Sequence, residues 1–355
     1  MDLTASTRTL ATAVSEAARL LPGALSSVVL RADAGGLTLI GADSERAVRL
    51  ACEANVHTDG QAAVPVTPLA ETLRMLDAPV VRLVVEGSRL AVRVDGARFA
   101  LPVLERDHPE APIPEKAAEV DGAALATALR TVAGTASRDD SLPLFTGVRL
   151  HLVDGRLNLV ASDRYRMAVA KVPPLSVSGP LDALVPASLL VEIGKQAKGI
   201  VGLHSAPSRF GLSWAGSAVT TAVLDGGFLS EDTIKTSTVD TTVEVRAESL
   251  AAAVRRVGVF AESRRVLTLE VGDGQLRLAS AKQDAGEAEE TIKANVLGGR
   301  TSPSFQARYL LDALQPFGNS EVRLEIQPGM RAAVVRAVDP GEVELTYFMM
   351  PTLVN

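Results

Sequence analysis

The chain has 355 residues and a formal net charge of −6, with 47% hydrophobic and 22% charged residues. This length predicts two or three domains, and the composition is that of a soluble globular protein, which excludes a short disordered or disulfide-stapled chain. No apolar run approaches the ~18 residues that a membrane helix needs, and the N-terminus shows no secretory signal, so we expect a cytoplasmic protein without a membrane partner. The acidic net charge argues at first against a nucleic-acid partner.

A strand-like apolar alternation that ends in a small polar turn occurs three times along the chain. It starts at Leu37, Leu157 and Leu276, so the starts are 120 and 119 residues apart. A second pair of matching stretches, 88–96 and 208–216, is also separated by 120 residues. The sequence therefore predicts a threefold repeat with a period of about 120 residues.

Each repeat is predicted to contain two helices. The first helix of each repeat has apolar residues at the i, i+4 and i+7 spacing of one buried stripe. These first helices are expected at 8–20, 122–138 and 248–265, with the stripes Leu10, Val14, Ala17; Leu125, Leu129, Val132; and Leu250, Val254, Val257. The second helices are expected at 67–77, 187–198 and 306–315.

Short alternating strands separated by Gly-rich or Asp-Gly turns fill the rest of each repeat, and such hairpins imply antiparallel pairing. Because about 120 residues is itself the size of a domain, we predict three α+β domains of one fold, each with two helices and antiparallel sheets. Proline-rich or polar stretches at 105–118 and 230–240 mark the boundaries. The predicted domains are 1–117, 118–240 and 241–355.

Positive charge is concentrated in the predicted helices. With their flanking residues, the six helices carry twelve Lys or Arg against seven Asp or Glu, which leaves −11 for the remainder of the chain. If the helices line one side of an assembly, an acidic protein acquires a basic inner face. Scattered, solvated helix charges are the alternative interpretation.

Four stretches carry a resemblance to a known family. They are RDDSLPLFTGVRL (138–150), LNLVASDRYRMAVAKV (157–172), QARYLLDAL (306–314) and FMMP (348–351). Together with the threefold repeat, they resemble the bacterial DNA polymerase III beta subunit, the replicative sliding clamp. The resemblance covers essentially the whole chain.

The resemblance implies a head-to-tail homodimer ring of six similar domains, with helices around a hole through which duplex DNA passes. Attraction to phosphates without contacts to base edges gives no sequence specificity, so such a ring can slide while it tethers the polymerase. The expected location is the cytoplasm, associated with the nucleoid. The DNA-facing residues would be Arg8, Arg19, Arg74, Arg130, Arg138, Lys195, Lys198, Arg255 and Arg256. Where clamps commonly carry an Arg near a Leu-Pro step, this chain has Leu21–Ser27 without one.

Ring closure in the family joins the first domain of one subunit to the third domain of the other through edge strands. Here these strands would lie near 97–103 and 266–271, with Phe99, Val266 and Leu267 at the dimer interface. Unpaired strand edges are natural templates for such pairing. For Phe99, a position in the core of its own domain is the alternative.

Clamps bind the polymerase III alpha subunit, the clamp loader and repair proteins through a hydrophobic pocket between the second and third domains, which accepts peptides of the Gln-Leu-x-Leu-Phe type. Apolar and sulfur-bearing side chains suit the Leu and Phe of such a peptide, and Arg and Gln suit its orientation. The matching positions are Phe145, Ser162, Arg164, Tyr165, Arg166, Met167, Leu229, Thr233, Ile234, Gln306, Tyr309, Met330, Ala332, Met349, Met350, Pro351 and Thr352. Without the resemblance, Met349 and Met350 would be interpreted as buried core.

The pocket departs from the family pattern. The linker has Leu229 where clamps commonly have Pro, and Thr233-Ile234 stands near a position often held by Arg. The C-terminal stretch lacks an Arg, with Leu353 in its place. We therefore keep a second hypothesis: a second-copy clamp that tolerates a cyclic-peptide inhibitor of the normal clamp and so gives self-resistance to that antibiotic. A monomeric peptide-binding scaffold is a third.

Neither an enzymatic site nor a cofactor or metal site is predicted. The four histidines, His57, His108, His151 and His204, show no metal-ligand spacing. Asp43 and Asp163 recur because the turn recurs, and Asp after a strand usually caps a turn. The single cysteine, Cys52, sits in an apolar alternation that predicts burial.

Overall fold

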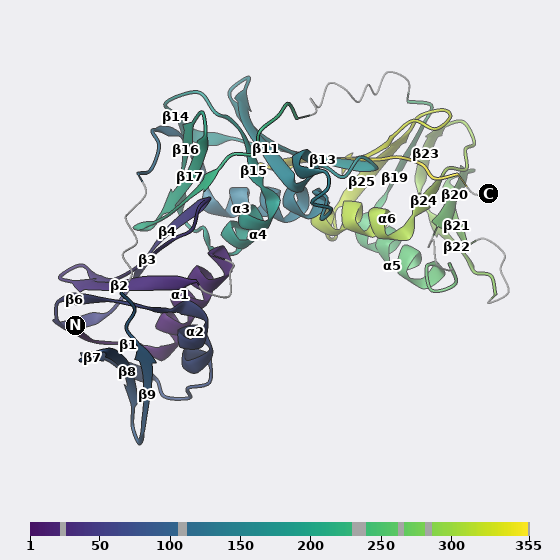
Figure 1. Cartoon of the computed structure of the whole chain (residues 1–355). Helices are drawn as coiled ribbons and strands as arrows, with labels where there is room; N and C mark the ends of the chain where they lie inside the picture. Colours follow the sequence, from purple (N-terminus) through teal and green to yellow (C-terminus); the bar gives the residue numbers. More distant parts are fainter. Residues whose placement is uncertain (22–25, 106–111, 229–238, 262–265, 281–285, 354–355) are drawn as a thin grey trace. The chain divides into compact units, whose positions relative to one another are not determined.

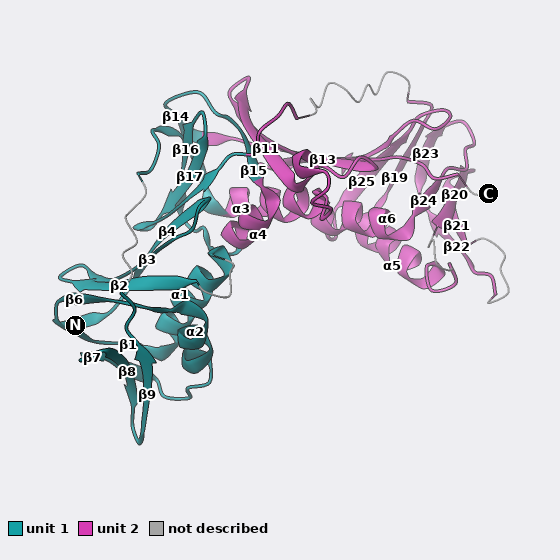
Figure 2. Cartoon of the chain, in the orientation of Figure 1, with its two compact units in different colours: residues 1–122, 175–185, 195–223 teal, residues 123–174, 186–194, 224–355 magenta. Residues whose placement is uncertain are grey.

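The structure is a computed structural model that describes residues 1–21, 26–105, 112–228, 239–261, 266–280 and 286–353. The chain divides into two compact units, which are coloured separately in Figure 2. Unit 1 contains residues 1–122, 175–185 and 195–223, and unit 2 contains residues 123–174, 186–194 and 224–355.

Unit 1 holds helices α1 (Thr7–Leu20) and α2 (Val66–Arg74) against antiparallel sheets. One sheet has the strand order β5-β1-β7-β8-β9, and the other has the order β14-β10-β16-β17-β18-β4-β3-β2-β6. The strands are β1 (Asp2–Ser6), β2 (Ser27–Asp33), β3 (Gly36–Ala42), β4 (Arg46–Cys52), β5 (Asn55–Thr58), β6 (Gly60–Pro65), β7 (Val80–Glu86), β8 (Arg89–Val94), β9 (Ala97–Pro102), β10 (Lys116–Asp121), β14 (Pro174–Val177), β16 (Ile200–Ala206), β17 (Arg209–Trp214) and β18 (Ser217–Ala222). The segment that leads from unit 1 into unit 2 contains β15 (Asp182–Pro186).

Unit 2 holds helices α3 (Gly122–Val132), α4 (Ala187–Gln196), α5 (Ala247–Val257) and α6 (Ala307–Leu314), which lie on one side of its strands in Figure 1. Strands β11-β12-β13-β27-β26-β25-β19-β23 form one antiparallel run, and β22-β21-β20-β24 form another sheet. The strands are β11 (Gly147–Val153), β12 (Arg156–Ser162), β13 (Arg166–Val172), β19 (Thr241–Arg246), β20 (Val266–Gly272), β21 (Gln275–Ser280), β22 (Glu289–Lys293), β23 (Asn295–Gly298), β24 (Ser304–Gln306), β25 (Glu321–Ile326), β26 (Ala333–Ala337) and β27 (Glu344–Met349).

The apolar stripes of the helices form the core as the sequence predicted. Each of the nine stripe residues predicted in α1, α3 and α5 is at most 2% exposed. Helix α1 begins after Ser6, whose hydroxyl accepts a hydrogen bond from the backbone N–H of Thr9 at 3.4 Å. The predicted helix ends were too late: α3 stops at Val132, where a short 3₁₀ turn (133–135) containing Gly134 takes over, and α5 stops before Gly258. Glycine favours the end of a helix because its helix propensity is among the lowest of all residues.

The recurring strand-turn pattern is also confirmed at the level of hydrogen bonds. In the first repeat, Oδ1 of Asp43 accepts from the backbone N–H groups of Glu45 and Arg46 at 2.8 and 2.7 Å. In the second repeat, Oδ1 of Asp163 accepts from those of Tyr165 and Arg166, both at 3.1 Å. These aspartates therefore cap equivalent turns, which explains their recurrence without any chemical role.

Candidate functional site

The second and third repeats share one sheet in unit 2. Strand β13 of the second repeat pairs with β27 of the third, so that Arg166 faces Met349 and Met167 faces Phe348. Just beyond the last strand, the backbone N–H of Met350 donates to the carbonyl of Tyr165 at 2.9 Å. Two stretches that the sequence assigned to the peptide pocket, near 165 and near 350, therefore lie side by side.

A buried apolar cluster underlies this joint. It contains Val160, Met167, Val169, Ala332, Val334 and Phe348, and Phe228 packs against it. The ring of Phe145 contacts that of Phe228 edge-on, with centroids 6.4 Å apart. Met349 is fully buried, whereas Met350 is 40% exposed, so the interpretation of both as core holds for Met349 alone.

Exposed side chains stand around this cluster. Tyr165 is 55% exposed and Met330 is 46% exposed, while Pro351 and Thr352 are half-buried. Thr352 is held in place because its N–H donates to the carbonyl of Ser304 at 2.8 Å. Gln306 is half-buried and Tyr309 is 7% exposed. Leu229, Thr233 and Ile234 lie outside the described residues.

Arg166, expected to help orient the peptide, is instead a buried cation. It is 7% exposed, and its Nε donates to Oδ2 of Asp163 at 2.9 Å while Nη1 donates to Asp312 and to the hydroxyl of Tyr347, the latter at 2.8 Å. Burial raises the pKa of Tyr347 to about 12, so this phenol stays neutral and accepts the hydrogen bond. Because Asp312 and Tyr347 come from the third repeat, Arg166 links the two repeats.

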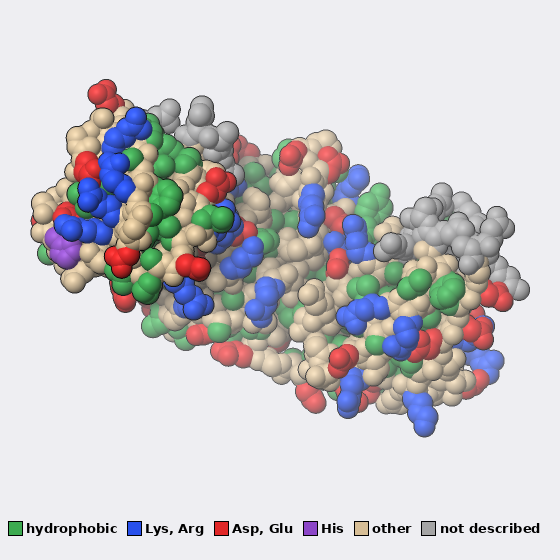
Figure 3. Space-filling view, turned by 90° about the horizontal axis from the view of Figure 1, so that it is seen from below, with side chains coloured by type: hydrophobic (Ala, Val, Ile, Leu, Met, Phe, Trp, Pro, Cys, Tyr) green, Lys and Arg blue, Asp and Glu red, His purple; other side chains and the backbone are tan. Residues whose placement is uncertain are grey.

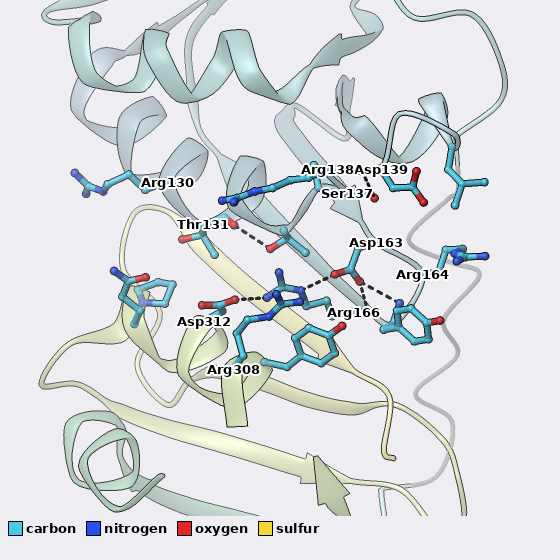
Figure 4. A pocket seen from close by; sticks show the side chains of 18 of the residues that line it. Arg130, Thr131, Ser137, Arg138, Asp139, Asp163, Arg164, Arg166, Arg308 and Asp312 are labelled. Carbon is cyan, nitrogen blue, oxygen red and sulfur yellow. Dashed lines mark hydrogen bonds and ion pairs between the residues drawn. The ribbon is translucent and has the colours of Figure 1, made fainter. Parts of the chain in front are cut away.

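A cavity of about 1000 Å³ opens beside this cation, between α3, the segment that follows α3, the Asp163–Arg166 turn and α6 (Figure 4). We call it the arginine pocket. Its charged and aromatic lining consists of Arg130, Arg138, Arg164, Arg166, Arg308, Asp139, Asp163, Asp312, Tyr165 and Tyr309. The sequence assigned some of these residues to DNA and others to the peptide, and it gave no role to Arg308 or Asp312.

The turn that leads into this pocket is strained at Arg164. Its φ of 78° lies in the left-handed region, which favours glycine. The equivalent turn of the first repeat holds Ser44 at an ordinary φ, so the turn itself does not require this conformation. In the second repeat, the buried hydroxyl of Ser162 accepts from the N–H of Arg164 at 3.1 Å and donates to the carbonyl of Arg166 at 2.8 Å. Ser162 thus shapes the turn from beneath and is not part of the exposed surface.

Replacing Arg164 with glycine is expected to raise the free energy of unfolding by about 0.5–1 kcal/mol, because relief of the left-handed strain exceeds the entropic cost of glycine. Urea unfolding measures the change. The matched control is Ser44→Gly, which adds the same flexibility to the equivalent turn with no strain to relieve, and it should lower stability by about 0.5–1 kcal/mol. Equal destabilisation by both changes would show that Arg164 is unstrained.

The nine predicted DNA-facing residues are all exposed. Seven lie on helices, whereas Arg138 and Lys198 follow α3 and α4. Within the bounds of the six described α-helices there are eight Lys or Arg and five Asp or Glu, so the excess is +3 and smaller than the predicted +5. On the face that Figure 3 shows, basic side chains are interspersed with acidic ones. Arg256 is held by Glu290 through two hydrogen bonds of 2.9 and 2.6 Å.

Of the two strands predicted to be edge strands at the dimer interface, one lies at the edge of its sheet and the other does not. Strand β9 ends its sheet, and Phe99 is 41% exposed, which excludes a core position in its own domain. The prediction of an edge strand at 266–271 is wrong, because β20 pairs with β21 on one side and β24 on the other. Val266 is half-buried and Leu267 is fully buried. The exposed apolar residues of this region are Val259 (79%) and Phe260 (42%), just after α5.

The described histidines, acidic residues and cysteine do not form a metal site or a reactive group. Among the described residues, no cluster of His, Cys, Asp and Glu could hold a metal ion. His204 bonds to the carbonyl of Pro114 and to Ser213, and His108 lies outside the described residues. Burial raises the pKa of the Cys52 thiol to about 11, which leaves it inert at neutral pH. The described helices include none of the length and apolar character that a membrane span requires.

Comparisons with known proteins identify the family. Models of the DNA polymerase III beta subunit match at 1–112 (N-terminal domain), 119–229 (central domain) and 237–353 (C-terminal domain). The beta sliding clamp of Streptomyces coelicolor is 30% identical over 362 residues, which cover 96% of each chain. The beta sliding clamp homolog GriR of Streptomyces muensis is 28% identical and covers 92% of this chain and 91% of its own length.

The fold agrees with solved clamp structures. The crystal structure of a DNA polymerase III beta subunit from Pseudomonas aeruginosa, bound to griselimycin, superposes with a TM-score of 0.88 at 22% identity and covers all of both chains. The predicted α+β fold of three clamp domains is thereby confirmed. The chain belongs to the DNA polymerase III beta subunit family, the beta sliding clamps, whose members are processivity factors of DNA replication and not catalytic enzymes.

Proposed function

We propose that this protein forms a homodimeric ring around duplex DNA and tethers the replicative polymerase and other partners through a peptide surface at the joint of the second and third repeats. We call this the peptide surface; Tyr165, Met330 and Met350 are its exposed members. The single observation that carries the proposal is their partial exposure above a buried apolar cluster, at the place where β13 and β27 pair. Exposed apolar groups on a rigid sheet suit the Leu and Phe anchors of an extended peptide.

The proposed ring places the helices toward DNA. Nine exposed Lys and Arg residues on or next to the helices attract phosphates at long range, and their mixture with acidic side chains prevents tight, immobile binding. Such contacts carry no sequence information, so the ring slides. We propose that the protein acts in the cytoplasm, at the nucleoid.

We propose that ring closure joins exposed apolar side chains of the first domain of one subunit to those of the third domain of the other. Phe99 on the terminal strand β9 supplies one side, and Val259 and Phe260 supply the other. Large exposed apolar residues near an open strand edge mark association sites. The domain boundaries at 117/118 and 240/241 belong to this proposal. The first lies in the gap between the N-terminal and central family models, and the second lies a few residues inside the C-terminal model, which begins at 237.

Met350→Glu is expected to weaken binding of a Gln-Leu-Ser-Leu-Phe peptide by about a hundredfold, because it places a charge where an apolar anchor must desolvate. Fluorescence anisotropy with a labelled peptide measures the Kd. The matched control is Met75→Glu, which makes the same substitution at an 86% exposed methionine in unit 1 and should leave the Kd unchanged. Absence of saturable binding by the unmodified protein would refute the peptide surface.

The second candidate, an inhibitor-tolerant second-copy clamp, is favoured by two observations. The protein is similar both to a clamp homolog named GriR and to a clamp bound to griselimycin. In addition, Leu353 is 68% exposed at the position where clamps often carry Arg. Griselimycin added as a competitor in the same titration separates the two candidates. Weak competition despite tight peptide binding supports the tolerant clamp, and efficient competition supports an ordinary replicative clamp.

A further inference from the structure

We propose that the arginine pocket receives acidic side chains that flank the core motif of a partner peptide. This inference rests on the proposed peptide surface and adds the chemical class of partner that this protein prefers: peptides with Asp or Glu next to the Gln-Leu-x-Leu-Phe core.

The pocket holds more positive charge than its own acids neutralise. Asp163 and Asp312 both bond to Arg166, so that these three side chains form one compact group. Among the described residues, none of the remaining pocket arginines forms an ion pair; these are Arg130, Arg138, Arg164 and Arg308. The remaining acid is Asp139, whose pKa is lowered by its hydrogen bonds to Ser141 and by the charge of Arg164. The pocket therefore has unsatisfied capacity for anions.

Arg308 lies beside the buried cation Arg166, on the same aromatic ring. Its guanidinium carbon lies 5.1 Å from the centre of the Tyr309 ring, and that of Arg166 lies 4.6 Å from the same centre. One aromatic ring thus attracts two cations, and in the described part of the chain only Arg166 of the two has carboxylate partners (Figure 4). A carboxylate from a ligand would pair with Arg308 through the planar, forked geometry that guanidinium groups offer.

The pocket is continuous with the peptide surface through one turn. Arg164 and Tyr165 line the pocket, and the carbonyl of Tyr165 is bonded to the N–H of Met350. The guanidinium of Arg164 lies 5.7 Å from the centre of the Tyr165 ring, so the left-handed φ of Arg164 holds a cation between the two regions. A peptide that crosses Tyr165 and Met350 reaches the pocket within a few residues.

An acidic peptide fits these observations better than a nucleic acid does. A volume of about 1000 Å³ accommodates several side chains of a peptide that is already anchored beside it. Recognition of acidic motifs by clustered arginines is a general mode of peptide binding. Charge complementarity would therefore select among partners that share the same apolar anchors.

The test compares the Kd values of three probe peptides for the full-length protein. Each contains Gln-Leu-Ser-Leu-Phe, flanked by Gly and Ser, by three Glu before the core, or by three Glu after it. We expect one Glu-flanked peptide to bind about tenfold tighter than the neutral one, and this advantage should shrink at high salt. Arg308→Gln should reduce the advantage to near onefold. Arg308 is exposed on α6, and a thermal melt checks that the variant is folded.

The matched control is Arg300→Gln, which removes the same charge from a 78% exposed arginine of unit 2 outside the pocket and should preserve the tenfold advantage. Tight binding of the neutral peptide with no gain from either Glu flank would overturn this inference and leave the proposed function standing. The inference would also be overturned if the tighter binding of the Glu-flanked peptide survived in the Arg308→Gln variant. It would be overturned equally if Arg308→Gln weakened the binding of a short DNA oligonucleotide but not that of the Glu-flanked peptide. If no peptide binds, the proposed function fails as well.

Discussion

Replacing Arg166 with methionine is expected to lower the free energy of unfolding by about 3 kcal/mol, because it removes one partner of a buried ion pair. Asp163 has a side chain only 13% exposed and would lose its cation, and the hydroxyl of Tyr347 would lose a donor. Asp312 is 42% exposed, so water compensates for part of its loss, and the effect falls at the low end for buried pairs. Methionine keeps the unbranched apolar stem of the side chain and removes the charged guanidinium.

Urea unfolding followed by circular dichroism measures this loss, and amide hydrogen exchange should accelerate in β13 and β27, which Arg166 holds together. A second change, Asp163→Asn, should recover part of the stability in the Arg166→Met protein, because it removes the abandoned charge and keeps the oxygen that caps the turn. The control is Arg300→Met, which breaks an exposed ion pair with Asp273 and should cost about 0–1 kcal/mol. A similar small loss for Arg166→Met would mean that the repeats are not linked by this cation.

Replacing Phe260 with aspartate is expected to convert the proposed dimer into monomers at micromolar concentration, with a dimer Kd raised by about a hundredfold or more. The ring of Phe260 is 42% exposed, so the folded monomer tolerates the change, whereas a closed interface would have to bury the new charge. Phe99→Asp, on the opposite side of the proposed interface, should have the same effect. Analytical ultracentrifugation distinguishes the two states.

The control for this experiment is Leu175→Asp, at a 56% exposed leucine on β14 that has no place in the proposed interface. It should leave the dimer intact. A protein that is monomeric without any substitution would favour the monomeric peptide-binding scaffold. A dimer that survives both Phe260→Asp and Phe99→Asp would place the interface elsewhere.

The sequence predicted those features that depend on local periodicity. Leu10, Val14 and Ala17 are buried because helical spacing puts them on one face, whatever packs against that face. Asp43 and Asp163 cap turns because a carboxylate oxygen reaches the N–H groups two and three residues ahead. The specific stretch around 157–172 carried the family resemblance for the same reason: it is contiguous in the chain.

The features that the sequence did not reveal depend on distant residues. Leu267 lies on a paired strand because 304–306 returns beside it, and alternation alone gives the two faces of a strand and not its lateral neighbours. Arg308 looks like any exposed helix charge until the Asp163–Arg166 turn is brought opposite to it. The left-handed φ of Arg164 could not be predicted from the sequence, because arginine is not among the residues that are enriched in this conformation.

Pairing of β13 with β27 has a consequence for synthesis of the protein. Lys171 faces Glu344, so one side of β13 remains without its neighbour while more than a hundred residues are still being translated. Contacts this distant in sequence form late and leave an unpaired strand exposed in the nascent chain. Tyr165 and Met350 meet only once the last strand has left the ribosome. Under the proposed function, unfinished chains therefore lack the peptide surface and do not compete with finished clamps for polymerase.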